Sequence, residues 1–283
     1  MTKVAVLTDS GVGMPLETLK KDGIYMLPLQ ITIDDHCYRD VYEINDQQLY
    51  SAQRQGKLCH TSCSNGKDIT DTLQHLVNEN YTDVIFIPLS SGLSSQANFV
   101  LSLAEDYPLT MHFIDCYTTC MIQYHIAKLA KLMVDNNEPI DKIITLANQL
   151  IDSASSLVVP LNLEQLKRGG RLTPLAASMA NLLKIKPILN IDKSSLGKLD
   201  VYEKVRTERK AIQYIIDETL KKTNDQPYHL YVIHSDCLPH ATLIKDELEK
   251  HPNITVTIGV ISSVISAHTG VDCLCIQAIP KIG

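Results

Sequence analysis

The sequence predicts an α/β protein of two domains. This prediction rests on the order of the expected strands and helices. In the first half, short apolar runs alternate with amphipathic segments, which is the pattern of βαβ units with a parallel sheet. In the second half, strands come from separate stretches without strict alternation, which is typical of an α+β domain. The 283 residues suffice for two domains of ordinary size. We expect an α/β domain over residues 1–153 and an α+β domain over residues 154–283.

The first half carries a strand pattern at Lys3–Thr8, Met26–Ile33, Asp83–Leu89 and Thr110–Asp115. Helical patterns follow at Asn45–Gln55, Lys67–Asn80, Ser94–Glu105 and Cys120–Asp135. Parallel sheets bind ligands at the carboxyl ends of their strands. Thr8–Ser10, Ser90–Ser94 and Asp115 fall at such ends, which indicates a site at this edge of the sheet.

The second half carries helical patterns at Pro139–Ala154, Asn162–Lys167, Pro174–Leu183, Arg206–Lys222 and Leu238–His251. Strand patterns lie at Leu157–Leu161, Ile185–Ile191, His229–His234, Ile254–Ser262 and Asp272–Ala278. Pro187 interrupts one of these strands, so we expect it near an edge or a bulge. The last strand is expected to close the sheet.

Composition excludes several classes of function. A net charge of −6 and an apolar fraction of 45% describe a soluble acidic protein, with no nucleic-acid partner expected. No run approaches 18 apolar residues and no signal-peptide pattern precedes the first strand, so we expect no stable membrane insertion and a cytoplasmic location. We also expect a monomer.

Eight cysteines raise the question of a metal site. None forms a C-x₂-C pair and no histidine cluster adjoins them, so we expect free thiols and no metal. Aromatic residues are few, with no Trp and only three Phe, so aliphatic side chains must build the core. Such an interior can pack tightly or line a long, smooth cavity.

Ser90, Ser91, Gly92, Ser94 and Ser95 form a loop where a strand passes into a helix. Hydroxyls and free backbone N–H groups can converge on an anion at such a junction. The loop holds no lysine to meet the charge of a nucleoside triphosphate, so it suits a smaller anion such as a carboxylate. The alternative is a serine that only caps the helix.

Three further motifs contain polar or charged side chains that could bind a ligand. Thr61 and Ser62 precede a helix, and either could be merely its N-cap. Residues 167–171, Lys-Arg-Gly-Gly-Arg, place cations around a turn, and the alternative is a helix C-cap. His268 sits between two expected strands, where a loop histidine is usually just solvated.

Together these motifs resemble one family, the DegV family, over nearly the whole chain. They are T-D-S-G-V-G-M-P at residues 8–15, T-S at 61–62, P-L-S-S-G-L-S at 88–94, L-x-x-L-K-R-G-G-R-L at 163–172, L-L-K-I-K-P-I-L at 182–189, Y-x-K-V-R at 202–206 and H-x-G at 268–270. Seven motifs in the family's order are far more specific than any one of them.

The resemblance implies a protein that binds a long-chain fatty acid, such as palmitate, between its two domains. The implied ligand residues are Thr61, Ser62, Ser90, Ser91, Gly92, Ser94, Arg171, His268 and Thr269. Thr61 and Ser94 would hold the carboxyl group. The resemblance further implies no cofactor besides the bound lipid and no catalysis by the chain itself. The resemblance also implies a partner: in many bacteria, proteins of this type present the bound acid to a fatty-acid kinase, for phosphorylation and phospholipid synthesis.

Physical chemistry supports this interpretation. Each buried methylene contributes about 0.8 kcal/mol, so a chain of about 14 methylenes offers roughly 11 kcal/mol before ordering costs. A cation such as Arg171 beside the carboxylate favours its charged form, and a histidine there is expected to titrate near neutral pH.

Two other classes of function remain open. A serine hydrolase would use Ser91 or Ser94 with His268 and Asp115, although Gln96 stands where the second glycine of G-x-S-x-G belongs. A phosphate-ligand binder would use the same loop with Arg171.

Overall fold

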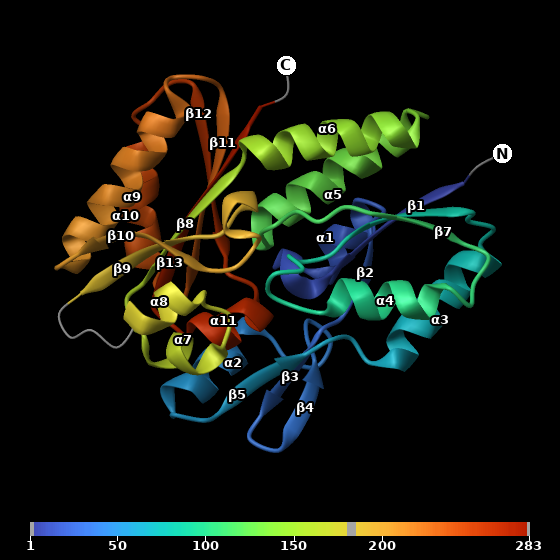
Figure 1. The fold of residues 1–283 in the computed structure, drawn as a ribbon, viewed down its shortest axis with the longest axis horizontal. Helices are drawn as coiled ribbons and strands as arrows, with labels where there is room; N and C mark the ends of the chain where they lie inside the picture. Colours follow the sequence, from blue (N-terminus) through green and yellow to red (C-terminus); the bar gives the residue numbers. More distant parts are fainter. Residues whose placement is uncertain (1–2, 180–184, 282–283) are drawn as a thin grey trace.

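Four parallel strands form the first sheet of the computed structural model, which describes residues 3–179 and 185–281 (Figure 1). In spatial order they are β2 (Tyr25–Leu27), β1 (Val4–Asp9), β6 (Asp83–Ile87) and β7 (Thr110–Phe113). α3 (Gly66–Asn78) and α4 (Gln96–Ala104) pack on Leu7 and Phe86. α5 (Cys120–Asp135) packs on Val6 and Ile85, because successive strand residues face opposite sides. The predicted parallel sheet is confirmed.

A second, antiparallel sheet was not expected. Its order is β4 (His36–Arg39), β3 (Gln30–Ile33) and β5 (Cys59–Ser62). The prediction of one extended segment over Met26–Ile33 is wrong, since β2 and β3 belong to different sheets. Pro28 stands at the break, where its missing N–H ends the ladder. The remaining elements of this region are η1 (Ser10–Val12), α1 (Leu16–Lys21) and α2 (Asp46–Arg54).

Six strands form the third sheet, mostly antiparallel as expected for an α+β region. Their order is β10 (Asp200–Val205), β9 (Lys186–Asn190), β8 (Ser155–Pro160), β13 (Cys273–Pro280), β11 (Tyr228–Ser235) and β12 (Ile254–Val260). The last strand lies in the middle between β8 and β11, so the expectation that it closes the sheet is wrong. Pro187 lies on β9, beside the edge strand β10, whose register shifts between Val201 and Glu203.

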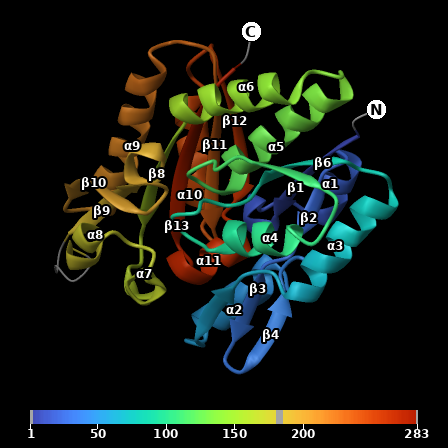
Figure 2. The ribbon, with the colours of Figure 1, turned by 45° about the vertical axis from the view of Figure 1, so that its right-hand side comes forward.

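The helices of the second half do not all pack on this sheet. They are α6 (Ile140–Ser153), α7 (Glu164–Gly169), α8 (Pro174–Met179), η2 (Lys193–Ser195), α9 (Glu208–Thr223), α10 (Leu238–Leu248) and α11 (Ser263–Thr269). α9 and α10 cover the outer face, while α5 and α6 lie between the two large sheets (Figures 1 and 2). The helix expected over Pro174–Leu183 begins as predicted, and its last four residues lie outside the described chain.

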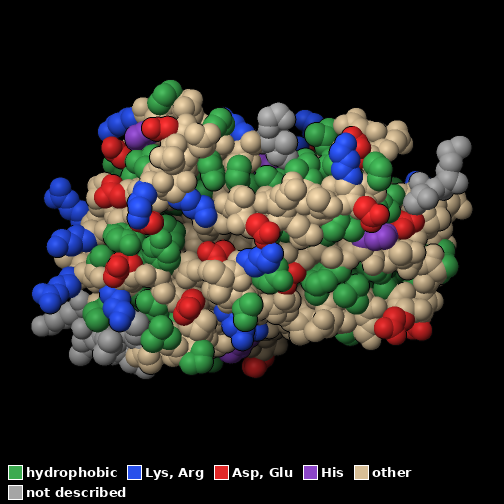
Figure 3. Space-filling view, turned by 45° about the horizontal axis from the view of Figure 1, so that its top comes forward, with side chains coloured by type: hydrophobic (Ala, Val, Ile, Leu, Met, Phe, Trp, Pro, Cys, Tyr) green, Lys and Arg blue, Asp and Glu red, His purple; other side chains and the backbone are tan. Residues whose placement is uncertain are grey.

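The sheets divide the chain at the link between α6 and β8. Strands up to residue 113 build the first two sheets, and strands from residue 155 build the third. A domain boundary between residues 153 and 154 agrees with this division and stays a prediction. Acidic and basic side chains are interspersed on the face drawn in Figure 3. Within residues 3–179 and 185–281, no helix has the length and apolar character needed to span a membrane.

Candidate functional site

A cavity of about 590 Å³ opens where the loop after β6, the strand β5, the turn after α7 and the helix α11 meet. These four segments are distant in sequence and carry the motifs singled out above. Eight of the nine residues expected to form the site line this cavity: Thr61, Ser62, Ser91, Gly92, Ser94, Arg171, His268 and Thr269. The structure thus brings these residues together, which motif spacing alone does not establish.

Thr61 reaches the cavity from a strand. It lies on β5 and pairs with Ile31 of β3. The residue that caps α3 is Asn65, whose side chain accepts from the N–H of Asp68 at 2.8 Å. The alternative interpretation of Thr61 or Ser62 as the helix N-cap is therefore wrong.

His268 lies on the short helix α11, where sequence reasoning placed a loop. Its Nε2 lies 2.6 Å from the Thr61 Oγ1, and its side chain is largely buried. The side chains of Gln53 and Gln165 each donate to a carbonyl of this helix at 2.8 Å, and so hold it from two sides. The alternative of a solvated loop histidine is wrong.

Burial governs the charge of His268. Desolvation, reinforced by Arg171 and His60, lowers its pKa to about 4, and a backbone hydrogen bond with Gly169 offsets part of this. The imidazole is therefore neutral at pH 7. The expectation that it titrates near neutral pH is wrong, because sequence reasoning placed it in an exposed turn.

A buried carboxylate fixes the start of the serine-rich loop. Asp9, at the end of β1, accepts from the N–H of Leu89 and of Gly11 at 3.0 Å each. The Nε2 of Gln123 donates to it at 2.9 Å. Burial raises the pKa of Asp9 to about 6, and these three hydrogen bonds keep it from rising further. Asp9 thus acts as a positioning residue for the loop.

The serines of the loop have different neighbours. Ser90 does not line the cavity, since its hydroxyl is buried and donates to the carbonyl of Gly197 at 2.9 Å. Ser91 bonds the carboxylate of Asp115. Ser94 Oγ accepts from the N–H of Gln96 at 3.2 Å, which leaves its O–H to donate. Ser94 therefore satisfies the first N–H of α4 and also faces the cavity, whereas the N-cap residue is Ser95, whose side chain makes no capping hydrogen bond.

Gln96 is a site residue that sequence reasoning missed. It accepts from the N–H of Ser64 at 3.0 Å and donates to the Ser64 hydroxyl at 2.7 Å. Both residues are buried. This reciprocal pair ties the segment that follows Thr61 to the serine-rich loop, and no sequence signal marks it.

Arg171 joins two walls of the cavity. Its Nη1 donates to the carbonyl of Gly169 at 2.8 Å, and its Nε donates to the carbonyl of Leu93 at 3.3 Å. Gly170 caps α7 with φ of 66°, a left-handed conformation that glycine adopts without strain. The C-cap interpretation of this motif is confirmed, and the arginine also lines the cavity.

The charge of the lining favours an anion. Lys198, which sequence reasoning did not single out, lines the cavity with Arg171. Among the described residues, no Asp or Glu does so. Cys63 lies within 3.9 Å of the Ser94 hydroxyl and adds a polarisable thiol to this end.

A second, apolar cavity adjoins the first. It measures about 30 Å³ and lies among α5, β8, β11 and β13. The two cavities share four lining residues: Leu93, Leu199, Ile265 and Thr269. Beyond them the walls are mainly aliphatic, with Val158, Ile191, Ile233 and Ile261 among the lining residues. A ligand with a polar head and an apolar tail matches this arrangement.

Hydrolase geometry does not assemble at this site. Ser91 bonds Asp115 directly, without a histidine between them, and His268 Nε2 contacts Thr61 instead of a serine. A serine nucleophile needs a base within hydrogen-bond reach. The observed contacts therefore do not link a serine hydroxyl to a histidine base.

The profile of the family described as "Uncharacterised protein, DegV family" matches residues 3–281. A DegV domain-containing protein of Streptococcus pneumoniae is 29% identical over 290 residues, covering 99% of this chain and 100% of its own. A DegV domain-containing protein of Listeria monocytogenes is 31% identical over 276 residues, covering 96% of each.

Solved structures show the same fold. A fatty acid binding DegV family protein from Streptococcus agalactiae superposes with a TM-score of 0.89 at 28% identity, covering 100% of both chains. DegV from Bacillus subtilis, a fatty acid binding protein, gives 0.88 at 26% identity, covering 99% of this chain and 100% of its own. The match over nearly all residues shows that this chain belongs to the DegV family.

Proposed function

We propose that this protein binds a long-chain fatty acid and presents it to a fatty-acid kinase, without turnover of its own. The observation that carries the proposal is that a polar and an apolar cavity adjoin each other and share Leu93, Leu199 and Ile265 as lining residues. The similar proteins of Streptococcus agalactiae and Bacillus subtilis, which bind fatty acids, support it.

The head group would lie among Thr61, Ser94 and Arg171. A buried carboxylate without partners is expensive, and hydroxyl donors with a nearby guanidinium remove that penalty. Neutral His268 would stay beside Thr61 and orient its hydroxyl. Lys198 adds a second positive charge to the lining.

The tail would pass the four shared residues into the apolar cavity. About 30 Å³ equals one water's share of the liquid, so the tail can advance only where aliphatic side chains shift. Each methylene that enters contributes about 0.8 kcal/mol. Affinity would therefore come mainly from this end.

The direct test is mass spectrometry of an organic extract of the purified protein. We expect a fatty acid at close to one equivalent per chain. An extract without lipid, together with retention of inorganic phosphate by the delipidated protein, would favour the phosphate-binding alternative and contradict the proposal.

Head-group placement is tested by comparing a free acid with its methyl ester. Arg171→Gln should weaken binding of the acid and leave binding of the ester nearly unchanged, because only the acid carries charge. Arg209→Gln, an exposed arginine on α9, is the matched control and should change neither. Equal losses for acid and ester would mean that Arg171 only supports the fold.

A further inference from the structure

A separate cavity of about 240 Å³ lies between η1, the turn from β4 to α2 and the link from β12 to α11. It shares no lining residue with the two cavities described above. Oxygen-bearing side chains gather around it: Ser10, Asp40, Asn45, Asp46, Ser262 and Ser263. Its walls come from both halves of the chain.

Asp40 is the unusual member of this cavity. Its side chain is only 1% exposed, and neither carboxylate oxygen has a hydrogen-bond partner. Burial, with Asp46 and Asp9 as nearby like charges, raises its pKa to about 7. Ser10 and the Val41 N–H lower the pKa in part but do not reach hydrogen-bond geometry. A buried charge in this state is costly, and either protonation or a bound cation removes that cost.

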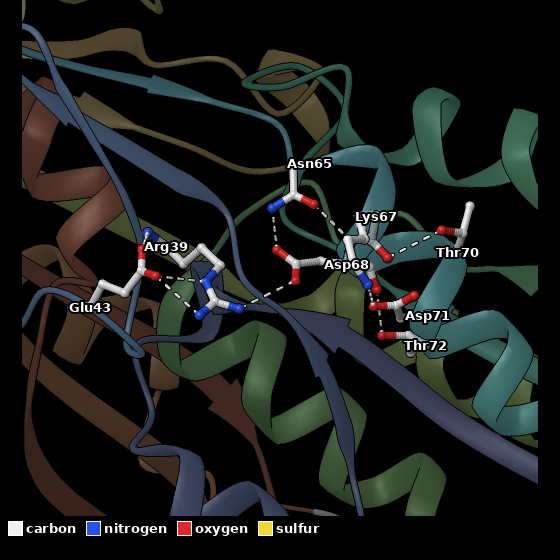
Figure 4. Close-up of polar contacts among 8 residues, drawn as sticks. All are labelled: Arg39, Glu43, Asn65, Lys67, Asp68, Thr70, Asp71 and Thr72. Carbon is white, nitrogen blue, oxygen red and sulfur yellow. Dashed lines mark hydrogen bonds and ion pairs between the residues drawn. The ribbon is translucent and has the colours of Figure 1, made fainter.

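The cation next to Asp40 in the sequence does not neutralise it. Arg39, the adjacent residue, bonds Glu43 at 3.0 Å and contacts Asp68 at 3.5 Å, as Figure 4 shows. Its guanidinium thus ties the turn after β4 to α3. Among the described residues that line the cavity, none is Lys, Arg or His.

The available ligands are hard oxygen donors. Asp46 is half-buried and lines the same cavity, where one of its oxygens accepts from the Ser263 hydroxyl. Carboxylates and hydroxyls suit Mg²⁺ or Ca²⁺ better than softer metals. No group of three or more His, Cys, Asp or Glu suited to a metal occurs within the described residues. Water must therefore complete the coordination, and Mg²⁺ characteristically keeps several waters beside one or two carboxylates.

We propose that this cavity binds a hydrated divalent cation through the carboxylates of Asp40 and Asp46. At roughly 30 Å³ per water, about 240 Å³ holds the ion with several water ligands. Bound there, the cation joins Asp40, in the turn before α2, to Asp46 at the start of α2, and its water ligands reach Ser262 and Ser263 of the link before α11, so it helps to hold α11 against the first half of the chain. The proposal does not depend on the identity of the lipid.

The test is titration of the metal-free full chain with MgCl₂, followed by calorimetry and by thermal unfolding. We expect one saturable site and a rise in melting temperature. Asp40→Asn, which keeps the shape and removes the charge, should weaken binding about tenfold or more. Asp246→Asn, an exposed carboxylate on α10, is the matched control and should bind as the parent does.

A measurement on the unaltered chain keeps the test decisive if Asp40→Asn does not fold. Mn²⁺ in place of Mg²⁺ should broaden amide resonances around Asp40 and Ser262 before any others. Absence of saturable binding, broadening centred elsewhere, or equal affinity in Asp40→Asn overturns the proposal. Binding of methylguanidinium without binding of Mg²⁺ also overturns it and points to an organic cation.

Discussion

The two adjoining cavities share Leu93, Leu199 and Ile265 as lining residues but are built in different ways. The polar one, of about 590 Å³, is formed by loops and short elements that hydrogen bonds hold in place. The apolar one, of about 30 Å³, lies among central strands and α5, where the strand ladder, the hydrogen bonds of Gln277 and aliphatic packing fix the walls. The comparison predicts that the polar end selects the head group while the apolar end sets the affinity, and that the apolar end is the one that must rearrange.

Blocking the apolar cavity should have the largest effect. Cys275 lines it and is buried, so Cys275→Phe would fill the space that the tail needs. Excluding about six methylenes removes about 5 kcal/mol of binding free energy for a long-chain acid. Calorimetry with a long and a short acid measures this.

The short acid is the internal control for Cys275→Phe, since it does not reach the blocked space. Its affinity should hold even if overpacking costs about 1–3 kcal/mol of stability. Equal weakening for both acids would show a general disturbance of the fold. Unchanged binding of the long acid would place the tail elsewhere.

Removing hydroxyls at the polar end should have a smaller effect. Thr61→Val and Ser94→Ala should each weaken binding of the acid by about 1–3 kcal/mol, because a buried acceptor loses a donor. Thr242→Val on exposed α10 is the matched control. Parental affinity in the double variant would contradict the placement of the carboxylate.

The last prediction concerns folding stability instead of binding, and follows from pH and the charge of His268. Its pKa is lowered to about 4 in the folded chain, against about 6.5 for the unfolded group. The folded state therefore disfavours the proton, so stability from this group is complete above pH 6.5 and is lost as the pH falls through 4. The loss is on the order of 3 kcal/mol.

Denaturant unfolding at several pH values measures this loss. The parent should lose stability between pH 6.5 and 4 more steeply than His268→Gln, which has no titrating imidazole. Parallel profiles would mean that burial of His268 contributes no pH dependence. The difference between the two proteins is the quantity to compare, because Asp9 and Asp40 titrate in both.

Long periodic segments were predictable from sequence, while short ones were not. α5 begins and ends at Cys120 and Asp135 as its pattern predicts. β4 escaped prediction because its four residues are partly exposed and lack clear alternation. α11 was missed because its seven residues include the strand-favouring pair Val264 and Ile265, and packing decides their conformation.

The site was predictable as a set of motifs and not as a set of contacts. Family resemblance indicated Thr61, Ser94 and Arg171, and the structure places all three at one cavity. The sequence did not predict a role for Gln96 or Lys198, because each acts on a segment that is distant in sequence and is brought close only by tertiary folding. The protonation state of His268 likewise depends on burial, which sequence does not report.

The contact between Thr61 and His268 joins residues 207 positions apart. Closing so long a loop carries a large entropic cost, so such contacts form late in folding. A ligand that must contact the segments of both Thr61 and His268 therefore cannot bind to the folding transition state. Such a ligand should leave the folding rate nearly unchanged and slow unfolding, so a bound lipid would set how long the native chain persists.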